Sequence, residues 1–178
     1  MERDLAVVVM GVAGSGKSTI GRRLAGVLGT AFLDADDLHP VENVRKMRAG
    51  EALTDADRGP WLRRVAAAAD ETPGPVVVAC SALRRAYRET LRAGIRRPVA
   101  FVHLDGGREL LAARLAERTG HFMPPELLDS QLDTLEPLGD DEPGFAVGIA
   151  GEPASVVAAI AARLGSGPDA AQPALSSG

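Results

Sequence analysis

The stretch "GVAGSGKS", residues 11–18, decides the fold of this chain. It matches G-x-x-x-x-G-K-[ST], a loop whose backbone N–H groups surround phosphate oxygens. The apolar run "LAVVVM" (5–10) before it predicts a buried parallel strand, and "KSTIGRRLAGVLG" (17–29) after it predicts a helix that ends at Gly29. Strand, loop and helix in this order favour a phosphate-binding loop over a glycine-rich turn that binds nothing.

Each residue type in this loop has a chemical reason to be there. The glycines let the backbone bend so that successive N–H groups point inward, and the following helix offers its positive N-terminus to an anion. Lys17 is placed to reach β- and γ-phosphates, and the Ser18 hydroxyl is placed to bind Mg²⁺. The predicted nucleotide-binding residues of the loop are Gly11, Gly14, Ser15, Gly16, Lys17, Ser18 and Thr19.

Strand-like and helix-like segments alternate along the rest of the chain. The pattern predicts further strands at 31–34, 75–80, 98–104 and 145–150, and helices at 40–49, 82–94, 107–120 and 153–164. The stretch 54–71 carries capping residues first, and Pro60 is then expected near the start of a further helix. Such alternation predicts an α/β fold, a three-layer sandwich in which helices cover both faces of a five-stranded parallel sheet, with the ligand site at the carboxyl ends of the strands.

Domain organisation is predicted to be simple. The length of 178 residues favours one domain, here residues 1–164. The stretch 121–144 is polar and rich in proline, with only weak helical patterning. The last residues, 165–178, are small and rich in proline, which predicts a disordered tail.

Composition excludes several classes of partner. The net charge is −4 and aromatic residues make up 3%, so neither electrostatics nor base stacking favours nucleic acid. No apolar run approaches the roughly 18 residues that a membrane helix needs, which predicts no membrane partner. The lone cysteine, Cys80, lies in an apolar run and favours a reducing cytoplasm.

A phosphate-binding loop leaves GTPases, motor-type ATPases and small-molecule kinases open. A GTPase needs an N/T-K-x-D motif, and the chain has none. The D-x-x-G at 141–144 lies in a proline-rich loop without a preceding strand. Asp105, at the end of the fourth predicted strand, keeps the ATPase alternative open. The short chain and its late polar segment favour a small kinase with a lid.

The carboxylates in "FLDADDLHPVENVRKM" (32–47) form the second candidate site. Asp34 and Asp36 are two positions apart, so they point the same way if the chain remains extended. One could hold magnesium, and the other could orient a substrate hydroxyl. The alternative, favoured for Asp37, is that these acids cap the helix that begins near Pro40.

Polar residues follow on the next predicted helix. His39, Asn43 and Lys46 are spaced to share one helix face, which offers donors and a positive charge. The alternative for Lys46 is a surface pair with Glu42, and a lone histidine in a loop is more often structural than catalytic.

Together these motifs resemble those of a known family. "GVAGSGKS", "LDADDLHPVENVRKMRAGEAL", "DADRGPWL", "CSALRRAYR", "GHF" and "SQLDTLE" are similar to the small P-loop gluconokinases, often called thermoresistant gluconokinases. The resemblance implies phosphorylation of the terminal hydroxyl of D-gluconate by Mg-ATP, giving 6-phosphogluconate. It also implies the P-loop fold of nucleoside monophosphate and shikimate kinases, a mobile lid at roughly 118–136, and a homodimer.

The resemblance also implies roles for residues on the acceptor side. It places Asp34 near the magnesium and Asp36 on the sugar-acid hydroxyls, as the group that orients or deprotonates the attacking one. It makes His39 and Lys46 substrate candidates, with Arg58 close by. The alternative for Arg58 is a surface ion pair with Asp55 or Asp57.

Arginines complete the predicted site. Arg84 is the candidate for gluconate's carboxylate, because a guanidinium offers forked donors to an anion. Its alternative, shared with Arg88, is an ordinary basic helix surface. Arg114 and Arg118, four residues apart, are candidates for the nucleotide and for the transferring phosphoryl group, whose charge grows in the transition state. Their alternative is a solvated helix end.

Two departures from the family pattern stand out. Ala52 replaces a frequent proline, and Gly148 stands where relatives carry an aspartate before the adenine loop, so the adenine contacts are not defined. Trp61 is expected to pack in the core. The rival functions are another small-molecule kinase, such as a shikimate or nucleotide kinase, and a nucleotide-binding protein without catalysis.

Overall fold

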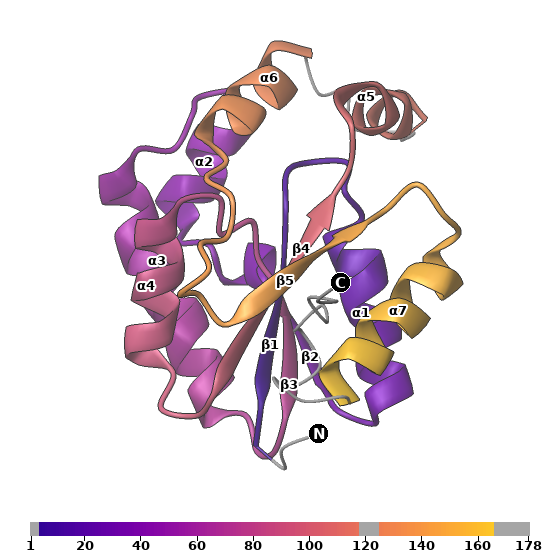
Figure 1. Cartoon of the computed structure of the whole chain (residues 1–178). Helices are drawn as coiled ribbons and strands as arrows, with labels where there is room; N and C mark the ends of the chain where they lie inside the picture. Colours follow the sequence, from indigo (N-terminus) through magenta and orange to yellow (C-terminus); the bar gives the residue numbers. More distant parts are fainter. Residues whose placement is uncertain (1–3, 118–124, 166–178) are drawn as a thin grey trace.

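Five parallel strands form a central sheet in the order β2–β3–β1–β4–β5 (Figure 1). The computed structural model describes residues 4–117 and 125–165. Its strands are β1 (Ala6–Met10), β2 (Ala31–Asp34), β3 (Val76–Ala79), β4 (Val99–Asp105) and β5 (Gly144–Gly148). All the pairings are parallel, so the predicted sheet is confirmed and the strands' carboxyl ends meet at one edge.

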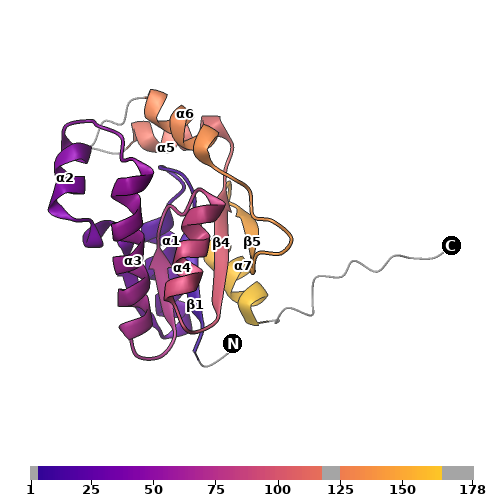
Figure 2. The ribbon, with the colours of Figure 1, turned by 90° about the vertical axis from the view of Figure 1, so that its left-hand side faces the viewer.

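Helices cover both faces of this sheet. They are α1 (Lys17–Leu28), the 3₁₀ helix η1 (Ala35–Leu38), α2 (Val41–Arg48), α3 (Asp55–Glu71), α4 (Arg85–Gly94), α5 (Arg108–Ala116), α6 (Pro125–Thr134) and α7 (Pro153–Gly165). In Figures 1 and 2, α3 and α4 lie on one face and α1 and α7 on the other, while α5 and α6 lie beyond the carboxyl edge. The predicted three-layer sandwich is confirmed.

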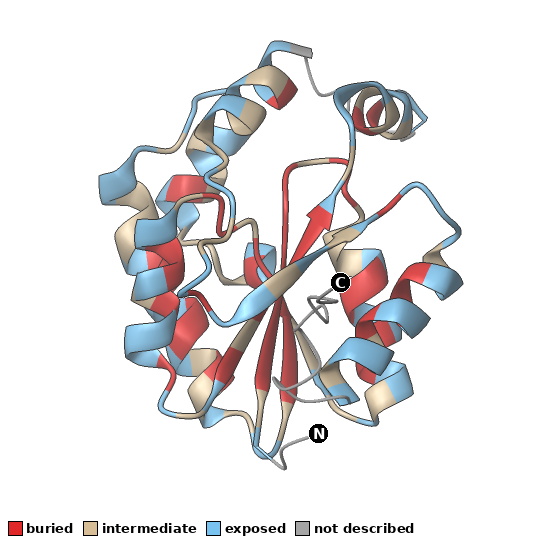
Figure 3. Cartoon of the chain, in the orientation of Figure 1, coloured by how far each residue is buried: buried red, intermediate tan, exposed pale blue. Residues whose placement is uncertain are grey.

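The central strand β1 separates two hydrophobic clusters. Val8 and Met10 belong to the cluster that α3 and α4 complete, and Val7 and Val9 belong to the cluster that α1 and α7 complete. All of β1 is buried, as Figure 3 shows for the centre of the sheet. Burial on both sides explains why this strand reads as a continuous apolar run.

Local capping chemistry sets the end of α1, where the sequence predicts it, and the start of α3, which lies earlier than the sequence predicts. Helix α1 stops at Gly29, whose left-handed φ of 65° suits glycine. Helix α3 begins after Thr54, which forms a capping box with Asp57. Because the capping box starts the helix at Asp55, Pro60 lies inside α3 and not near its start.

One predicted helix boundary is wrong, and one weakly patterned stretch contains a helix. The helix predicted from residue 82 begins at Arg85, because Ala82 has a φ of 43°, outside the right-handed helical region. The weakly patterned stretch 121–144 contains a helix, α6, which buries Leu128.

Parts of the predicted organisation lie outside the described residues, namely 118–124 of the lid and 166–178 of the tail. The division into one domain, lid and tail stays a prediction. Among the helices of the described ranges, none combines the length and the apolar character that a membrane crossing requires.

Candidate active site

The glycine-rich loop follows the central strand and is tightly enclosed. The Gly11 N–H donates to the Ser81 carbonyl at 3.3 Å, which fixes the start of the loop beside the end of β3. Gly14 has a φ of 80°, and a Cβ there would lie 2.9 Å from the Leu111 carbonyl oxygen of α5. Only glycine fits this position without moving α5.

The loop residues fit the phosphates of a nucleotide. The Ser15 side chain is fully buried, and its hydroxyl finds no hydrogen-bond partner among residues 4–117 and 125–165. A buried unpaired hydroxyl costs roughly 1–3 kcal/mol, and a phosphate oxygen would remove that cost. Helix α1 starts at Lys17 after a glycine, so no side chain caps its first N–H groups, and its N-terminus suits an anion.

The chain does not remain extended after β2, so strand geometry does not align the side chains of Asp34 and Asp36. The Asp34 side chain accepts a hydrogen bond from the Asp36 N–H at 3.2 Å and caps η1, so the chain turns at once. The expectation of an extended chain at this point is therefore wrong. The Asp36 side chain is 80% exposed, which leaves it accessible to an acceptor molecule.

The sheet nevertheless places the two aspartates and the phosphate loop on either side of the end of β3. Asp34 pairs with Ala79, the last residue of β3, and the Gly11 N–H at the start of the loop donates to the Ser81 carbonyl just after this strand. Burial raises the pKa of the Cys80 thiol, which lies at the same strand end, to about 12. In the described part of the chain, no three or more His, Cys, Asp or Glu side chains form a metal-binding group. A magnesium ion held by one carboxylate, one hydroxyl, phosphates and water would need no such group.

His39 is packed as a structural residue. Its ring stacks on Trp61 with centroids 4.2 Å apart and planes 12° apart, and its side chain is 5% exposed. The Trp61 Nε1–H donates to the Ala35 carbonyl at 2.7 Å, which confirms core packing for Trp61. His39 Nε2 still lies 3.9 Å from an Asp36 oxygen, so a role beside the acceptor stays a prediction.

Burial lowers the pKa of His39, and the same holds for His103. A depressed histidine pKa means that the unfolded chain takes up a proton below about pH 6.5 more readily than the folded chain. We expect the free energy of unfolding to fall between pH 7.5 and 5.5, and to fall less in His39→Phe, which keeps a ring on Trp61. Urea titrations at both pH values test this. An unchanged pH dependence in the variant would contradict it, because His103 contributes equally to both proteins.

Lys46 is held by helix α3 and not by its own helix. Its ammonium donates to both carboxylate oxygens of Asp57 at 2.8 Å, in place of the alternative pair with Glu42. These bonds, with those from Thr54, lower the pKa of Asp57 to about 2. The Asn43 amide donates to the Asp57 carbonyl at 3.1 Å, so the predicted polar face of α2 lies against the start of α3. Contact of Lys46 with a substrate stays a prediction.

Arg58 and Arg84 lie near the same tyrosine. The Arg58 guanidinium lies 5.6 Å from the centre of the Tyr87 ring and donates to the Leu53 carbonyl. This bond takes the place of the surface ion pair with Asp55 or Asp57 that was the alternative for Arg58. Arg84 donates to Asp55 at 3.0 Å and lies 5.9 Å from the Tyr87 ring. The Tyr87 hydroxyl also donates to Asp55. The fold thus places two arginines near the Tyr87 ring, Arg58 on α3 and Arg84 just before α4.

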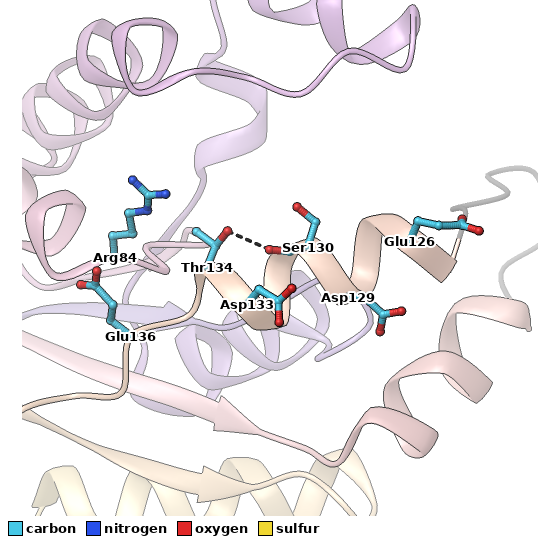
Figure 4. A pocket seen from close by; sticks show the side chains of 7 residues that line it. All are labelled: Arg84, Glu126, Asp129, Ser130, Asp133, Thr134 and Glu136. Carbon is cyan, nitrogen blue, oxygen red and sulfur yellow. Dashed lines mark hydrogen bonds between the residues drawn. The ribbon is translucent and has the colours of Figure 1, made fainter.

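A cavity of about 530 Å³ opens between Arg84 and helix α6 (Figure 4). Its lining is polar and consists of Arg84, Glu126, Asp129, Ser130, Asp133, Thr134 and Glu136. The volume suits a small molecule. Carboxylate and hydroxyl oxygens accept hydrogen bonds from a polyhydroxyl compound, and one guanidinium is available for an anionic end.

A smaller cavity of about 190 Å³ lies on the other side of the loop, between the start of α1 and the loop after β5. Its lining includes Ser15, Thr19 and Arg114, and Arg114 donates from Nη2 to the Ile149 carbonyl at 2.6 Å. With Gly14 and Gly16, which also line it, five predicted nucleotide residues surround this one space. Arg118, the predicted partner of Arg114, lies outside the described residues.

Two residues of this region have contacts that the sequence analysis did not predict. Arg88 is no basic surface, because its side chain is 1% exposed and pairs with Glu142. Its spacing of three from buried Leu91 was the available signal. Gln131 of α6 accepts a hydrogen bond from the Ala13 N–H of the loop at 2.7 Å, and no local pattern indicates that contact.

Comparison with known proteins agrees with this arrangement. A family model described as "AAA domain" matches residues 7–138. The gluconokinase of Gluconobacter oxydans is 52% identical over 143 residues, covering 77% of this chain and 78% of that protein. A probable gluconokinase of Xenopus tropicalis is 46% identical over 162 residues, covering 82% and 85%. The crystal structure of a gluconokinase from Sinorhizobium meliloti matches with a TM-score of 0.83 and 46% identity, over 92% of this chain and 95% of that one.

Proposed function

The chain belongs to the gluconokinase family, and from this we propose that it transfers the γ-phosphoryl group of ATP to the terminal hydroxyl of D-gluconate, giving 6-phosphogluconate and ADP. One observation in the structure supports the proposal: Asp34 pairs with Ala79 at the end of β3, and the phosphate loop that carries Lys17 begins at Gly11, which donates to the Ser81 carbonyl beside the same strand end. In this proposal Lys17 is the cation for phosphates, Asp34 an oxygen ligand for a metal, and Asp36 the acceptor for a hydroxyl proton.

Some residues of the site bind the nucleotide and the metal, and one orients the acceptor hydroxyl. Mg-ATP, when bound, supplies the phosphoryl group and neutralises part of its charge. The loop N–H groups, the Ser15 hydroxyl and Lys17 bind phosphate oxygens, and the Ser18 hydroxyl and Asp34 are the oxygen ligands for magnesium. The exposed Asp36 accepts a hydrogen bond from the attacking hydroxyl, aligns it, and receives its proton at a carboxylate oxygen.

The acceptor is an anion with several hydroxyls, and the cavity beside α6 offers oxygen acceptors for the hydroxyls and one guanidinium, that of Arg84, for the anionic end. Its carboxylate and hydroxyl side chains accept hydrogen bonds from the polyol chain. The same carboxylates repel the substrate's own carboxylate, so that end belongs at Arg84. Arg84 would exchange Asp55 for the substrate there, while Arg58, His39 and Lys46 remain candidates around it.

The proposal also includes a lid, a homodimer and a cytoplasmic setting. Helix α6 belongs to the segment 118–136 expected to act as a lid, and closure of that lid would exclude water from the transfer. A homodimer follows from the family resemblance. A cytoplasmic setting follows from the lone cysteine, which is buried.

The test is ADP release in a coupled assay with Mg-ATP and a panel of acceptors: D-gluconate, other aldonates, glucose, shikimate and nucleoside monophosphates. We expect turnover with gluconate, and a loss of about 10²-fold or more in Asp36→Asn with ADP binding retained. Asp37→Asn removes the neighbouring charge and serves as the matched control with near-normal turnover.

Other outcomes of the panel identify the rivals. Preferred turnover on shikimate or a nucleoside monophosphate would replace gluconate as the substrate. Nucleotide binding without turnover on any acceptor would leave a binding protein. Equal activity in Asp36→Asn would remove that carboxylate from the mechanism.

A further inference from the structure

Helix α6 contacts the phosphate loop through one polar side chain. The Ala13 N–H donates to Gln131 Oε1 at 2.7 Å, a bond between residues 118 positions apart. A backbone N–H can only donate, so the carboxamide oxygen and not its nitrogen must face Ala13. A bond this short between a loop amide and a distant helix is a specific link between them.

The peptide group that Gln131 contacts is also held at its other end. The carbonyl of the same peptide unit, that of Val12, accepts a hydrogen bond from the Lys17 ammonium at 3.1 Å and from the Ser15 N–H at 3.3 Å. A cation on the carbonyl polarises the peptide and makes its N–H a better donor. Lys17 and Gln131 therefore strengthen each other's bond through one peptide plane.

One face of helix α6 packs against the core beside the phosphate loop, and the opposite face lines a cavity. Leu128, which is 2% exposed, and Leu132 pack with the cluster that contains Val12, and a helical turn of 100° per residue puts Gln131 on that side. The opposite face includes Ser130 and Asp133, which line the 530 Å³ cavity (Figure 4). Any shift of α6 relative to the loop therefore changes the cavity.

We propose that Gln131 is a positioning residue that fastens α6 to the phosphate loop in the nucleotide-free enzyme, and that nucleotide phosphates compete with this bond. The inference rests on the nucleotide site of the proposed function. When phosphates bind, Lys17 turns from the Val12 carbonyl to the phosphate oxygens, and the peptide loses its polarisation. Phosphate oxygens also attract the N–H groups of the loop. Both effects release Gln131, so α6 and the cavity that it lines adjust only after nucleotide is present.

Two substitutions at this position have opposite expected effects. In Gln131→Leu no bond has to break, so ADP should bind about 2- to 10-fold more tightly, the range set by one hydrogen bond. The Ala13 N–H should also lose its protection against hydrogen exchange. In Gln131→Glu an acceptor oxygen remains, so protection should remain, but its negative charge beside the phosphates should weaken ADP binding.

The experiment is titration calorimetry with Mg-ADP and amide hydrogen exchange on the full chain. Leu127→Ala, an exposed position on the same helix, is the matched control and should change neither measurement. Tighter ADP binding in Gln131→Leu, with faster exchange at Ala13, supports the inference. Unchanged or weaker ADP binding in that variant overturns it. Failure of the wild-type chain to bind ADP would instead overturn the proposed function.

Discussion

Replacement of Lys17 by methionine is expected to lower kcat/KM for gluconate by about 10³-fold while the protein remains folded. Methionine keeps much of the length of the side chain and removes its charge. Negative charge spreads over the γ-phosphoryl oxygens in the transition state, so the missing ammonium matters more there than in the bound ground state. The loss should therefore appear mainly in kcat, with a smaller change in ADP affinity.

The fold of Lys17→Met should be nearly as stable as that of the wild type. In the structure the ammonium bonds the Val12 carbonyl at a partly buried position, and one such bond contributes only about 1 kcal/mol. Coupled ADP release and thermal unfolding measure the two effects separately. Arg23→Met, which removes a charge from the exposed side of the same helix, is the control for a general change in net charge. Activity of Lys17→Met within tenfold of the wild type would show that the loop does not hold the phosphates as proposed.

Replacement of Arg88 by methionine is expected to destabilise the fold by about 3–5 kcal/mol, because it leaves the Glu142 carboxylate buried without its cation. Arg88 Nε and Nη2 donate to the two oxygens of Glu142 at 2.6 and 2.8 Å, and the side chains are 1% and 2% exposed. The Arg88 guanidinium holds the pKa of Glu142 below its usual range. Four carbonyls, those of Ala82, Leu83, Glu136 and Pro137, also accept from Arg88.

The double variant Arg88→Met/Glu142→Leu separates the buried charge from the packing. With both charges gone, much of the stability should return, and the four carbonyls left without their donor should keep the recovery incomplete. Urea denaturation of wild type, single and double variants gives the three free energies. Arg85→Met breaks the neighbouring exposed pair with Asp141 and should leave the urea midpoint nearly unchanged. If the free energy of unfolding of Arg88→Met were no lower than that of Arg85→Met, the buried pair would not stabilise this fold.

The Arg88 pair also matters for the site. Arg88 joins α4, and the Ala82 and Leu83 carbonyls before it, to residues 136–142, which follow α6. Glu136, at the start of these residues, lines the 530 Å³ cavity together with Arg84, so the pair helps to hold the end of α6 beside the cavity proposed for the acceptor. A folded Arg88 variant should accordingly show a raised KM for gluconate.

Features that depend on neighbours in the chain could be predicted from the sequence. The phosphate loop, the buried strand before it and the stop of α1 at Gly29 follow from glycine geometry, apolar runs and capping over a few residues. The capping box at Thr54 is of the same kind. Alternating strand and helix patterns then allow few topologies, which is why the parallel sheet was predictable.

Features that depend on the order of the strands were decided only by the tertiary structure. The order β2–β3–β1–β4–β5 brings Asp34 to one side of the end of β3 and the start of the phosphate loop to the other, although η1 turns the chain away from the extended arrangement. Arg88 finds Glu142 54 residues away, and Ala13 finds Gln131 118 residues away. Burial of a charge or an amide depends on which segments close over it. No local pattern carries that information, so the loop was evident from the chain alone, while its partners came from the packing of the whole sheet.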